Sequence, residues 1–181
     1  MKDIPYGSLG KKDNTDAYVV IFTLVICFAV GLSEVHLFGD SASYAMMVNS
    51  WVHDGDLIWA EEDFERIDAD PEMMSLRGLI MKRVDDHYEY SKPAFYPLLC
   101  FPLYLIFGQQ ALLILNGLLL AGIILLSYFH LRQFSDPITS ISFSVATVLF
   151  SVVFFYTTIA MADMLQFFLI ALTYYMVARK R

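Results

Sequence analysis

Long stretches without charge alternate with charged segments along this chain. Residues 17–33 and 93–131 contain no Asp, Glu, Lys or Arg, and residues 137–178 contain only Asp163. A helix rises about 1.5 Å per residue, so about 20 apolar residues cross a hydrocarbon core about 30 Å thick. The three stretches therefore predict membrane-spanning helices, and the first has the length of one retained anchor.

Basic residues indicate which side of the membrane each end of a span faces, because short loops rich in Lys and Arg stay in the cytoplasm. They precede the first stretch, follow the second and end the sequence: Lys2, Lys11, Lys12, His130, Arg132, Arg179, Lys180 and Arg181. The loop 40–92 contains 13 acidic and 5 basic residues. We expect this acidic loop to lie outside the cytoplasm.

The second stretch must then cross the membrane an odd number of times. As one helix its 39 residues would be about 58 Å long, which is too long for one crossing. Two crossings would return the chain to the side of the membrane on which it began. Three prolines in its first part and Gly108 favour a break, which predicts an interfacial segment followed by one crossing. The third stretch crosses twice, with Asp163 at its outer turn, because a carboxylate at mid-membrane costs at least about 2.5–3.5 kcal/mol.

We therefore predict an all-α integral membrane protein with about four transmembrane helices and a long extracytoplasmic first loop that carries interfacial helices. Its predicted parts are a cytoplasmic N-terminus (1–16), a first span (17–38), the extracytoplasmic loop (39–92), an interfacial segment (93–108), a second span (109–131), a cytoplasmic loop (132–137), a third span (138–158), an outer turn (159–163), a fourth span (164–178) and a cytoplasmic end (179–181).

Two helices are expected inside the outer loop. Residues 41–53 place Tyr44, Val48 and Trp51 on one side, which predicts a helix lying in the membrane surface with Trp51 as its anchor. Residues 73–84 predict a short amphipathic helix, and the acidic residues 61–72 between them are expected to be mostly loop.

The composition supports a membrane protein and excludes several other classes. Hydrophobic residues make up 57% of the chain and charged residues 17%, against about 25% charged in an average soluble domain, so disorder is excluded. The net charge of −7 argues against a nucleic-acid partner. Cys27 and Cys100 lie in apolar runs and provide neither a disulfide framework nor zinc-ligand spacing.

The four-crossing topology places three ionisable residues on the outer face: Asp40, Lys92 and Asp163. Each has a simpler interpretation. Asp40 could cap a helix, Asp163 could serve the dipole of the returning helix, and Lys92 could extend toward the membrane surface. Glu34 could line a cavity or reach the lipid headgroups.

Other charged groups also have two interpretations. Arg77, Lys82 and Arg83 could grip a phosphate, or could contact headgroups or solvent. Asp85, Asp86 and His87 could hold a metal, although a solvated acidic run is the simpler interpretation. The remaining histidines suit the membrane interface: His36, His53 and His130.

Short motifs follow one another over residues 34–178: Gly39–Tyr44, Asp54–Leu57, Tyr90–Pro93, Pro97–Leu99, Pro102–Tyr104, Phe107–Gly108, Asn116 and Ala162–Leu165. In this order and spacing they resemble the GT-C class of membrane glycosyltransferases. The closest branch is family 39, with the protein O-mannosyltransferases, the lipid A aminoarabinose transferase and Rgt-like bacterial relatives. The family's first motif is Asp-Glu, whereas Ser41 follows Asp40 here.

The resemblance implies an inverting transfer of a hexose or pentose from a polyprenyl-phosphate-linked donor to a lipid, glycan or protein acceptor. In that reaction Asp40 would accept the acceptor's proton and Asp163 would be a second catalytic carboxylate that orients the acceptor. Lys92 would balance the departing phosphate, and Tyr44 would contact the sugar. Arg77, Lys82 and Arg83 would be further substrate-binding cations. Residues 39–92 would then be the catalytic loop.

The resemblance also implies a cell-envelope protein of a bacterial inner membrane whose active face is extracytoplasmic. The sequence identifies no required cofactor and leaves a divalent metal open, with Asp40 and Asp163 as its ligands. Family members have more crossings, so we expect the N-terminal part of a longer enzyme, a split or decayed copy, or a fragment. The alternatives are a non-catalytic membrane assembly or binding subunit and a small transporter-like helical bundle.

Overall fold

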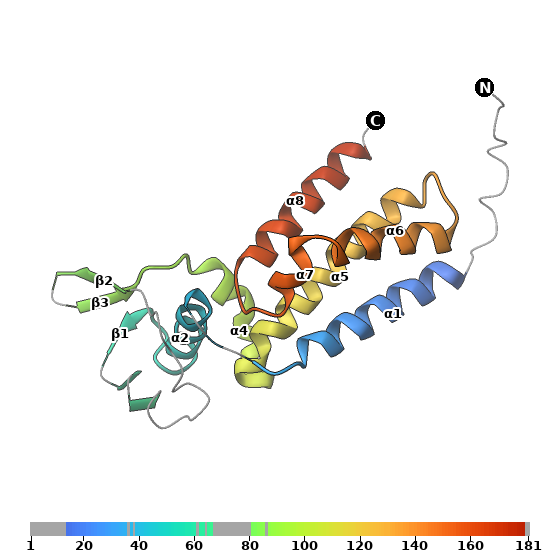
Figure 1. The fold of residues 1–181 in the computed structure, drawn as a ribbon. Coiled ribbons are helices and arrows are strands. Elements are labelled where there is room, and N and C mark those ends of the chain that lie inside the picture. Colours follow the sequence, from blue (N-terminus) through green and yellow to red (C-terminus); the bar gives the residue numbers. More distant parts are fainter. Residues whose placement is uncertain are drawn as a thin grey trace, which may run out of the picture.

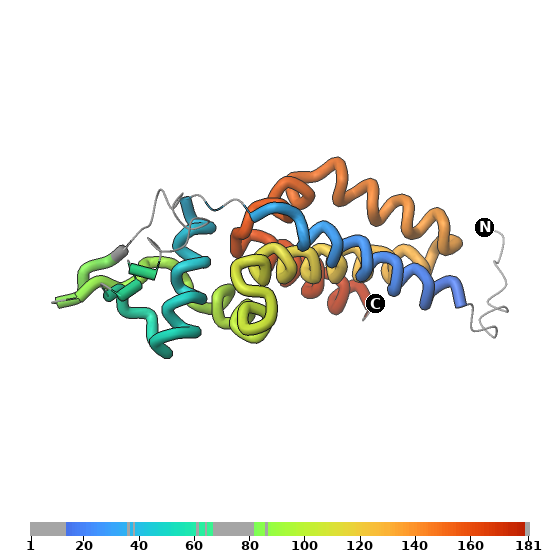
Figure 2. The backbone as a smooth tube through the Cα atoms, turned by 90° about the horizontal axis from the view of Figure 1, so that it is seen from below, coloured from blue at the N-terminus to red at the C-terminus, as the bar shows by residue number. Residues whose placement is uncertain are grey.

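The apolar stretches form a group of long helices that lie side by side (Figure 1). The computed structural model describes residues 14–35, 37, 39–60, 62–63, 65–66, 81–85 and 87–179. Its long helices are α1 (Asn14–Gly31), α5 (Ala111–Leu131), α6 (Pro137–Leu149) and α8 (Asp163–Ala178). Helix α5 packs against each of the other three, and Figure 2 shows it running between them. The core of this helical group is therefore built around α5.

Two helical runs are long and apolar enough to cross a membrane. One is α1, and the other is the run Phe95–Leu131, which contains α4 (Phe95–Phe107), the 3-10 turn η1 (Gly108–Gln110) and α5. Helices α6 and α8 are apolar but shorter. Large apolar side chains on the outside of these helices are exposed, including Phe22, Ile106 and Ile170 at 66%, 73% and 66%. Such a surface fits a membrane protein, and the four-crossing arrangement stays a prediction.

The break predicted inside the second apolar stretch lies at Gly108. This residue has a φ of +56°, in the left-handed region that favours glycine, and it ends α4. The chain then passes through η1 into α5. The third apolar stretch is also interrupted, because α6 is followed by the separate short helix α7 (Val152–Thr157).

The outer loop contains a sheet, so the expectation of an all-α protein is wrong for this part of the chain. Strands β1 (Ile58–Trp59), β2 (Met81–Val84) and β3 (His87–Tyr90) form an antiparallel sheet in the order β1-β3-β2. The helix expected over 73–84 is wrong at its C-terminal end, because Met81–Val84 is a strand paired with β3. Residues 73–80 lie outside the described part. Tyr88 and Tyr90, both strong strand formers, alternate along β3 and favour this pairing.

Helix α2 (Asp40–His53) lies between the sheet and the long helices (Figure 1). It packs against α4 and buries nine of its residues, including Tyr44 and Val48. Trp51, the expected membrane anchor, is partly buried. Helix α2 is therefore a packed element between α4 and the described part of residues 54–90, which we call the outer lobe.

Helices α1 and α5 approach each other closely at Gly117, so we expect an added methyl group there to destabilise the protein. A Cβ atom added to Gly117 on α5 would lie 2.2 Å from the carbonyl oxygen of Cys27 on α1. We expect Gly117→Ala to lower the free energy of unfolding by about 1–3 kcal/mol, because backbone cannot move aside as a side chain can. Thermal unfolding in detergent measures this. The control Gly122→Ala meets only the ring of Phe168 and should cost less; equal losses would contradict the account.

Candidate functional site

Asp40 and Lys92 form an ion pair between two distant parts of the sequence. The Nζ atom of Lys92 lies 2.6 Å from Oδ2 of Asp40, and the two side chains are 22% and 41% exposed. Asp40 is the first residue of α2, and Lys92 follows β3 just before α4. The pair therefore joins the beginnings of two packed helices while both charges stay within reach of solvent.

The local backbone explains how Asp40 begins α2. Gly39, with a φ of +57°, is the N-cap residue of α2, so the alternative interpretation of Asp40 as the helix cap is wrong. A glycine tolerates this left-handed conformation, which turns the chain sharply into the helix. The interpretation that Lys92 only extends toward the membrane surface is also wrong, since its ammonium group pairs with Asp40.

Tyr44 lies next to this pair, one helical turn along α2. Its side chain is buried, with 7% of the residue exposed. Burial raises the pKa of the Tyr44 phenol, and the negative charges of Asp40 and Asp163 raise it further. The phenol thus experiences both carboxylates, which places Asp163 at the same side of the molecule as Asp40.

Asp163 is the first residue of α8. A negative charge in the first turn of a helix is stabilised by the helix dipole, so the simpler interpretation of Asp163 holds together with its proximity to Tyr44. Figures 1 and 2 both show the beginning of α2 facing the loop that leads into α8. The structure therefore gathers Asp40, Lys92, Tyr44 and Asp163 at one end of the long helices.

Two of the other predicted cations, Lys82 and Arg83, lie on a strand of the sheet. Lys82 and Arg83 are exposed on β2, opposite Glu89 and Tyr88 of β3. Nε of Arg83 donates to the carbonyl oxygen of Asp85 at 3.2 Å. Arg77 lies outside the described residues, as do Asp86 and His36. Lys92 is accordingly the cation that the structure places beside Asp40.

No match was found when the chain was compared with family models, curated proteins and solved structures. The chemistry of the site is therefore argued from its residues alone.

The sequence leaves a divalent metal open, with Asp40 and Asp163 as its ligands. Within the ranges that the structure describes, no three His, Cys, Asp or Glu side chains come close enough together to hold a metal ion. Divalent magnesium and calcium prefer several oxygen ligands, whereas Asp40 already has Lys92 as its counter-charge. His87, part of the second metal hypothesis, pairs with Glu89 at 3.1 Å.

Two buried polar residues behind the site were not assigned a role from the sequence. The hydroxyl of Tyr96 on α4 donates to Oδ1 of Asn116 on α5 at 2.8 Å, and the ring of Tyr96 packs edge-on against Tyr44 with centroids 5.2 Å apart. A sequence signal did exist for Asn116, because an amide inside an apolar helix must find hydrogen-bond partners. The partners themselves follow only from helix packing.

Arg66 is a third residue to which the sequence assigned no role. Its guanidinium donates to both carboxylate oxygens of Asp54 and to Oδ1 of Asp63, the last at 2.5 Å. Asp63 is completely buried and accepts a further bond from the backbone N–H of Ala60 at 2.9 Å. Arg66 is the only basic residue in the acidic segment 54–72, which was the available signal. These ion pairs anchor part of the segment expected to be mostly loop.

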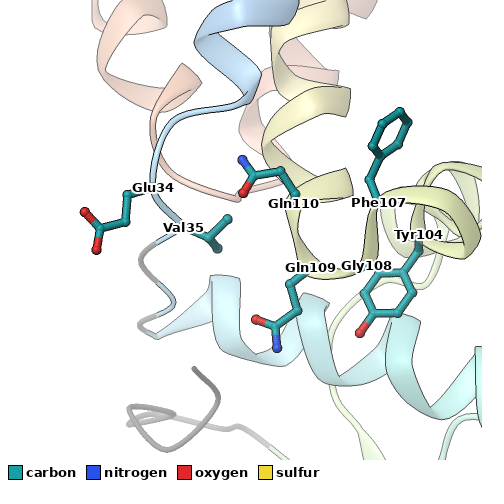
Figure 3. A pocket seen from close by; sticks show the side chains of 7 residues that line it. All are labelled: Glu34, Val35, Tyr104, Phe107, Gly108, Gln109 and Gln110. Carbon is teal, nitrogen blue, oxygen red and sulfur yellow. The ribbon is translucent and has the colours of Figure 1, made fainter. Parts of the chain in front are cut away.

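A cavity of about 590 Å³ opens beside the linker that connects α1 to α2. Figure 3 shows its lining, in which Tyr104 and Gln109 are directed toward α2. Glu34 belongs to this lining, but it is exposed, and its carboxylate points away from the other labelled side chains in Figure 3. Gln110 holds the linker in place, since its Nε2 donates to the carbonyl oxygens of Gly31 and Ser33 at 2.6 and 2.7 Å.

Proposed function

We propose that this chain is a membrane glycosyltransferase, or the N-terminal part of one. It would transfer a sugar from a polyprenyl-phosphate-linked donor to an acceptor at the outer face of the cytoplasmic membrane. The observation that supports this proposal most is the Asp40–Lys92 pair, with Tyr44 one helical turn further along α2, where the charge of Asp163 raises the pKa of the phenol. A base and a cation at one solvent-accessible point are the two groups that such a transfer needs.

The proposed reaction is a single displacement. The acceptor hydroxyl gives its proton to the carboxylate of Asp40, and its oxygen forms a bond to the anomeric carbon. The bond between that carbon and the phosphate oxygen breaks, so the configuration inverts. The electron pair leaves with the polyprenyl phosphate, whose added negative charge lies beside the ammonium group of Lys92.

The remaining groups have supporting roles in this proposal. The buried phenol of Tyr44 keeps its proton, since its pKa is raised by burial and by two carboxylates, and it can donate to a sugar hydroxyl. Asp163 orients the acceptor from the beginning of α8. The acceptor is a lipid, a glycan or a protein.

The position of the site supports a substrate with a lipid tail. The group lies where the beginning of α2 faces the long helices (Figure 1). These helices expose apolar side chains such as Phe22 and Ile170. A donor whose tail stays in lipid would present its sugar at such a junction. We propose a bacterial inner membrane as the location, with the outer lobe on the extracytoplasmic side.

Transfer of a radiolabelled sugar from a synthetic polyprenyl-phosphate donor, measured with the chain in proteoliposomes, tests the proposed function. A non-catalytic subunit or a small transporter would give no transfer product. Charged residues are absent from the middle of α1, α5 and α6 in the described chain, an arrangement that gives little support to an ion-coupled transporter.

Cysteine labelling tests the sidedness on which this proposal depends. The native Cys27 and Cys100 are buried, at 2% and 0% exposure, so they provide a silent background. We expect Glu62→Cys in the outer lobe to react with a membrane-impermeant maleimide on intact cells. Gln133→Cys, in the loop after α5, should react only after the membrane is opened, and the reverse pattern would contradict the topology. Both positions are exposed.

A further inference from the structure

We propose that Tyr96 and Asn116 form a buried positioning element that holds Asp163 and Tyr44 in place around the Asp40–Lys92 pair. The two residues lie on different helices, and neither has been given a role in the chemistry above. Their role in turnover rests on the proposed function, whereas their role in geometry does not.

Asn116 binds the segment that leads to Asp163. Its Nδ2 donates to the carbonyl oxygen of Ile159 at 2.7 Å and to that of Tyr156 at 3.3 Å. These carbonyls lie at the end of α7 and in the turn before α8, where helix ends leave acceptors without partners inside the helix. Asn116 is completely buried. The amide therefore fixes the turn from which Asp163 begins α8.

Tyr96 connects this amide to the other side of the site. Its hydroxyl donates to Oδ1 of Asn116 at 2.8 Å and lies 3.2 Å from the carbonyl oxygen of Leu112. Its ring meets the ring of Tyr44 at an interplanar angle of 69°. Tyr96 also belongs to the first turn of α4, shortly after Lys92. One side chain thus contacts both α2 and α5.

Polar groups at this depth are costly unless every one has a partner. Asn116 uses its acceptor and its donor group, and Tyr96 uses its hydroxyl. A Phe–Leu pair would fill nearly the same space, but it would leave the turn before α8 without a directional contact. The hydrogen bonds of Tyr96 and Asn116 therefore fix the position of the turn before α8, in addition to the contribution of both side chains to packing.

The test reads the electrostatic environment of Tyr44 and needs no activity. We would place 3-fluorotyrosine at position 44 and follow its ¹⁹F signal through an alkaline titration of the detergent-purified chain. The charged groups assigned to this phenol are Asp40 on its own helix and Asp163 on α8, and Tyr96 packs on it from α4. Asp163→Asn should lower the titration midpoint, because it removes a negative charge that disfavours the phenolate.

Asn116→Leu is expected to lower the midpoint in the same direction, since Asp163 is no longer held close. Adding Asp163→Asn to Asn116→Leu should then produce little further shift. Tyr96→Phe, which removes only a hydroxyl, gives a smaller downward shift and replaces Asn116→Leu as the test if the latter does not fold. The proposal is overturned if these variants titrate like the unmodified chain, or if Asp163→Asn has its full effect in both backgrounds.

Tyr128→Phe is the matched control. Tyr128 is also a buried tyrosine, and its hydroxyl donates to Asp16 of α1 at 2.5 Å, near the opposite end of α5. Its removal should lower thermal stability and leave the Tyr44 midpoint unchanged. An equal shift in this variant would mean that loosening of the helices in general, rather than the position of Asp163, moves the signal.

A transfer assay separates this proposal from the proposed function. With an active chain, we expect Asn116→Leu to lower kcat by about 100-fold, as displaced catalytic groups do, with a smaller effect on KM. If the midpoints shift as expected and the unmodified chain transfers no sugar, the positioning role holds and the transferase function fails. If the chain is active and the midpoints do not respond, the positioning role alone fails.

Discussion

Replacing Asp40 by asparagine should lower the rate of sugar transfer by about 10²–10⁴-fold, the usual contribution of a general base. Asparagine keeps the size of the side chain and loses the group that accepts the acceptor's proton. The ion pair with Lys92 becomes at best a hydrogen bond from the ammonium group to a neutral amide oxygen. Since this pair is partly exposed, the loss of stability should be no more than about 1 kcal/mol. Initial rates and thermal unfolding of the same preparations measure both effects.

Asp136→Asn is the control for this variant. Asp136 also lies at the beginning of a helix, where its carboxylate accepts bonds from the N–H groups of Ile138 and Thr139 at 3.0 and 3.1 Å. Asparagine caps helices as well as aspartate does, so this variant should insert and turn over normally. Near-normal transfer by Asp40→Asn would show that Asp40 is not the base.

Lys92→Gln should reduce kcat by about 10²–10³-fold, which is the effect of removing one group that stabilises charge developing in the transition state. The departing phosphate would lose the cation beside it, and Asp40 would lose its counter-charge. Lys92→Arg keeps the positive charge and should retain more activity than Lys92→Gln. Steady-state kinetics with the polyprenyl-phosphate donor measure the difference.

Two further variants make this prediction specific. Arg179→Gln removes an exposed cation at the other end of α8 and should leave transfer unchanged. The exchange Asp40→Lys with Lys92→Asp keeps two opposite charges in contact but moves the base to the wrong side. We expect this double variant to fold and to be inactive. Equal rates for Lys92→Gln and Lys92→Arg would contradict the electrostatic role.

The positions of the long helices were largely predictable from the chain. Apolar helices need long runs with few charges, and α5 and α6 lie entirely within charge-free runs. Helices α1 and α8 each carry one acidic residue in the first turn, Asp16 and Asp163. Among the described residues, α1 and the run that contains α5 are long enough to cross a membrane. The same reasoning placed Asp40, Lys92 and Asp163 on one face, and the structure pairs the first two and brings the charge of the third to Tyr44. Topology alone supports this kind of prediction because it limits where a charged residue can lie.

The outer lobe was less predictable for physical reasons. A strand of two residues such as β1 leaves almost no pattern, and the cations of Met81–Val84 suit an amphipathic helix as well as a strand. The hydrogen-bond partners of Asn116 depend on how α4, α5 and the turn before α8 pack together. The local sequence of one element does not specify this packing. The Arg66 ion pairs likewise depend on a fold of the loop that no local signal specifies.

We propose the Asp40–Lys92 pair as the chemical centre of a sugar transfer at the outer membrane face. The most direct measurement is the initial rate of sugar transfer from a radiolabelled polyprenyl-phosphate donor, with the unmodified chain and the Asp40→Asn, Lys92→Gln double variant compared in proteoliposomes. We expect transfer by the unmodified chain and a loss of at least about 100-fold in the double variant. Equal rates in the two preparations, or no transfer by either, would contradict this proposal.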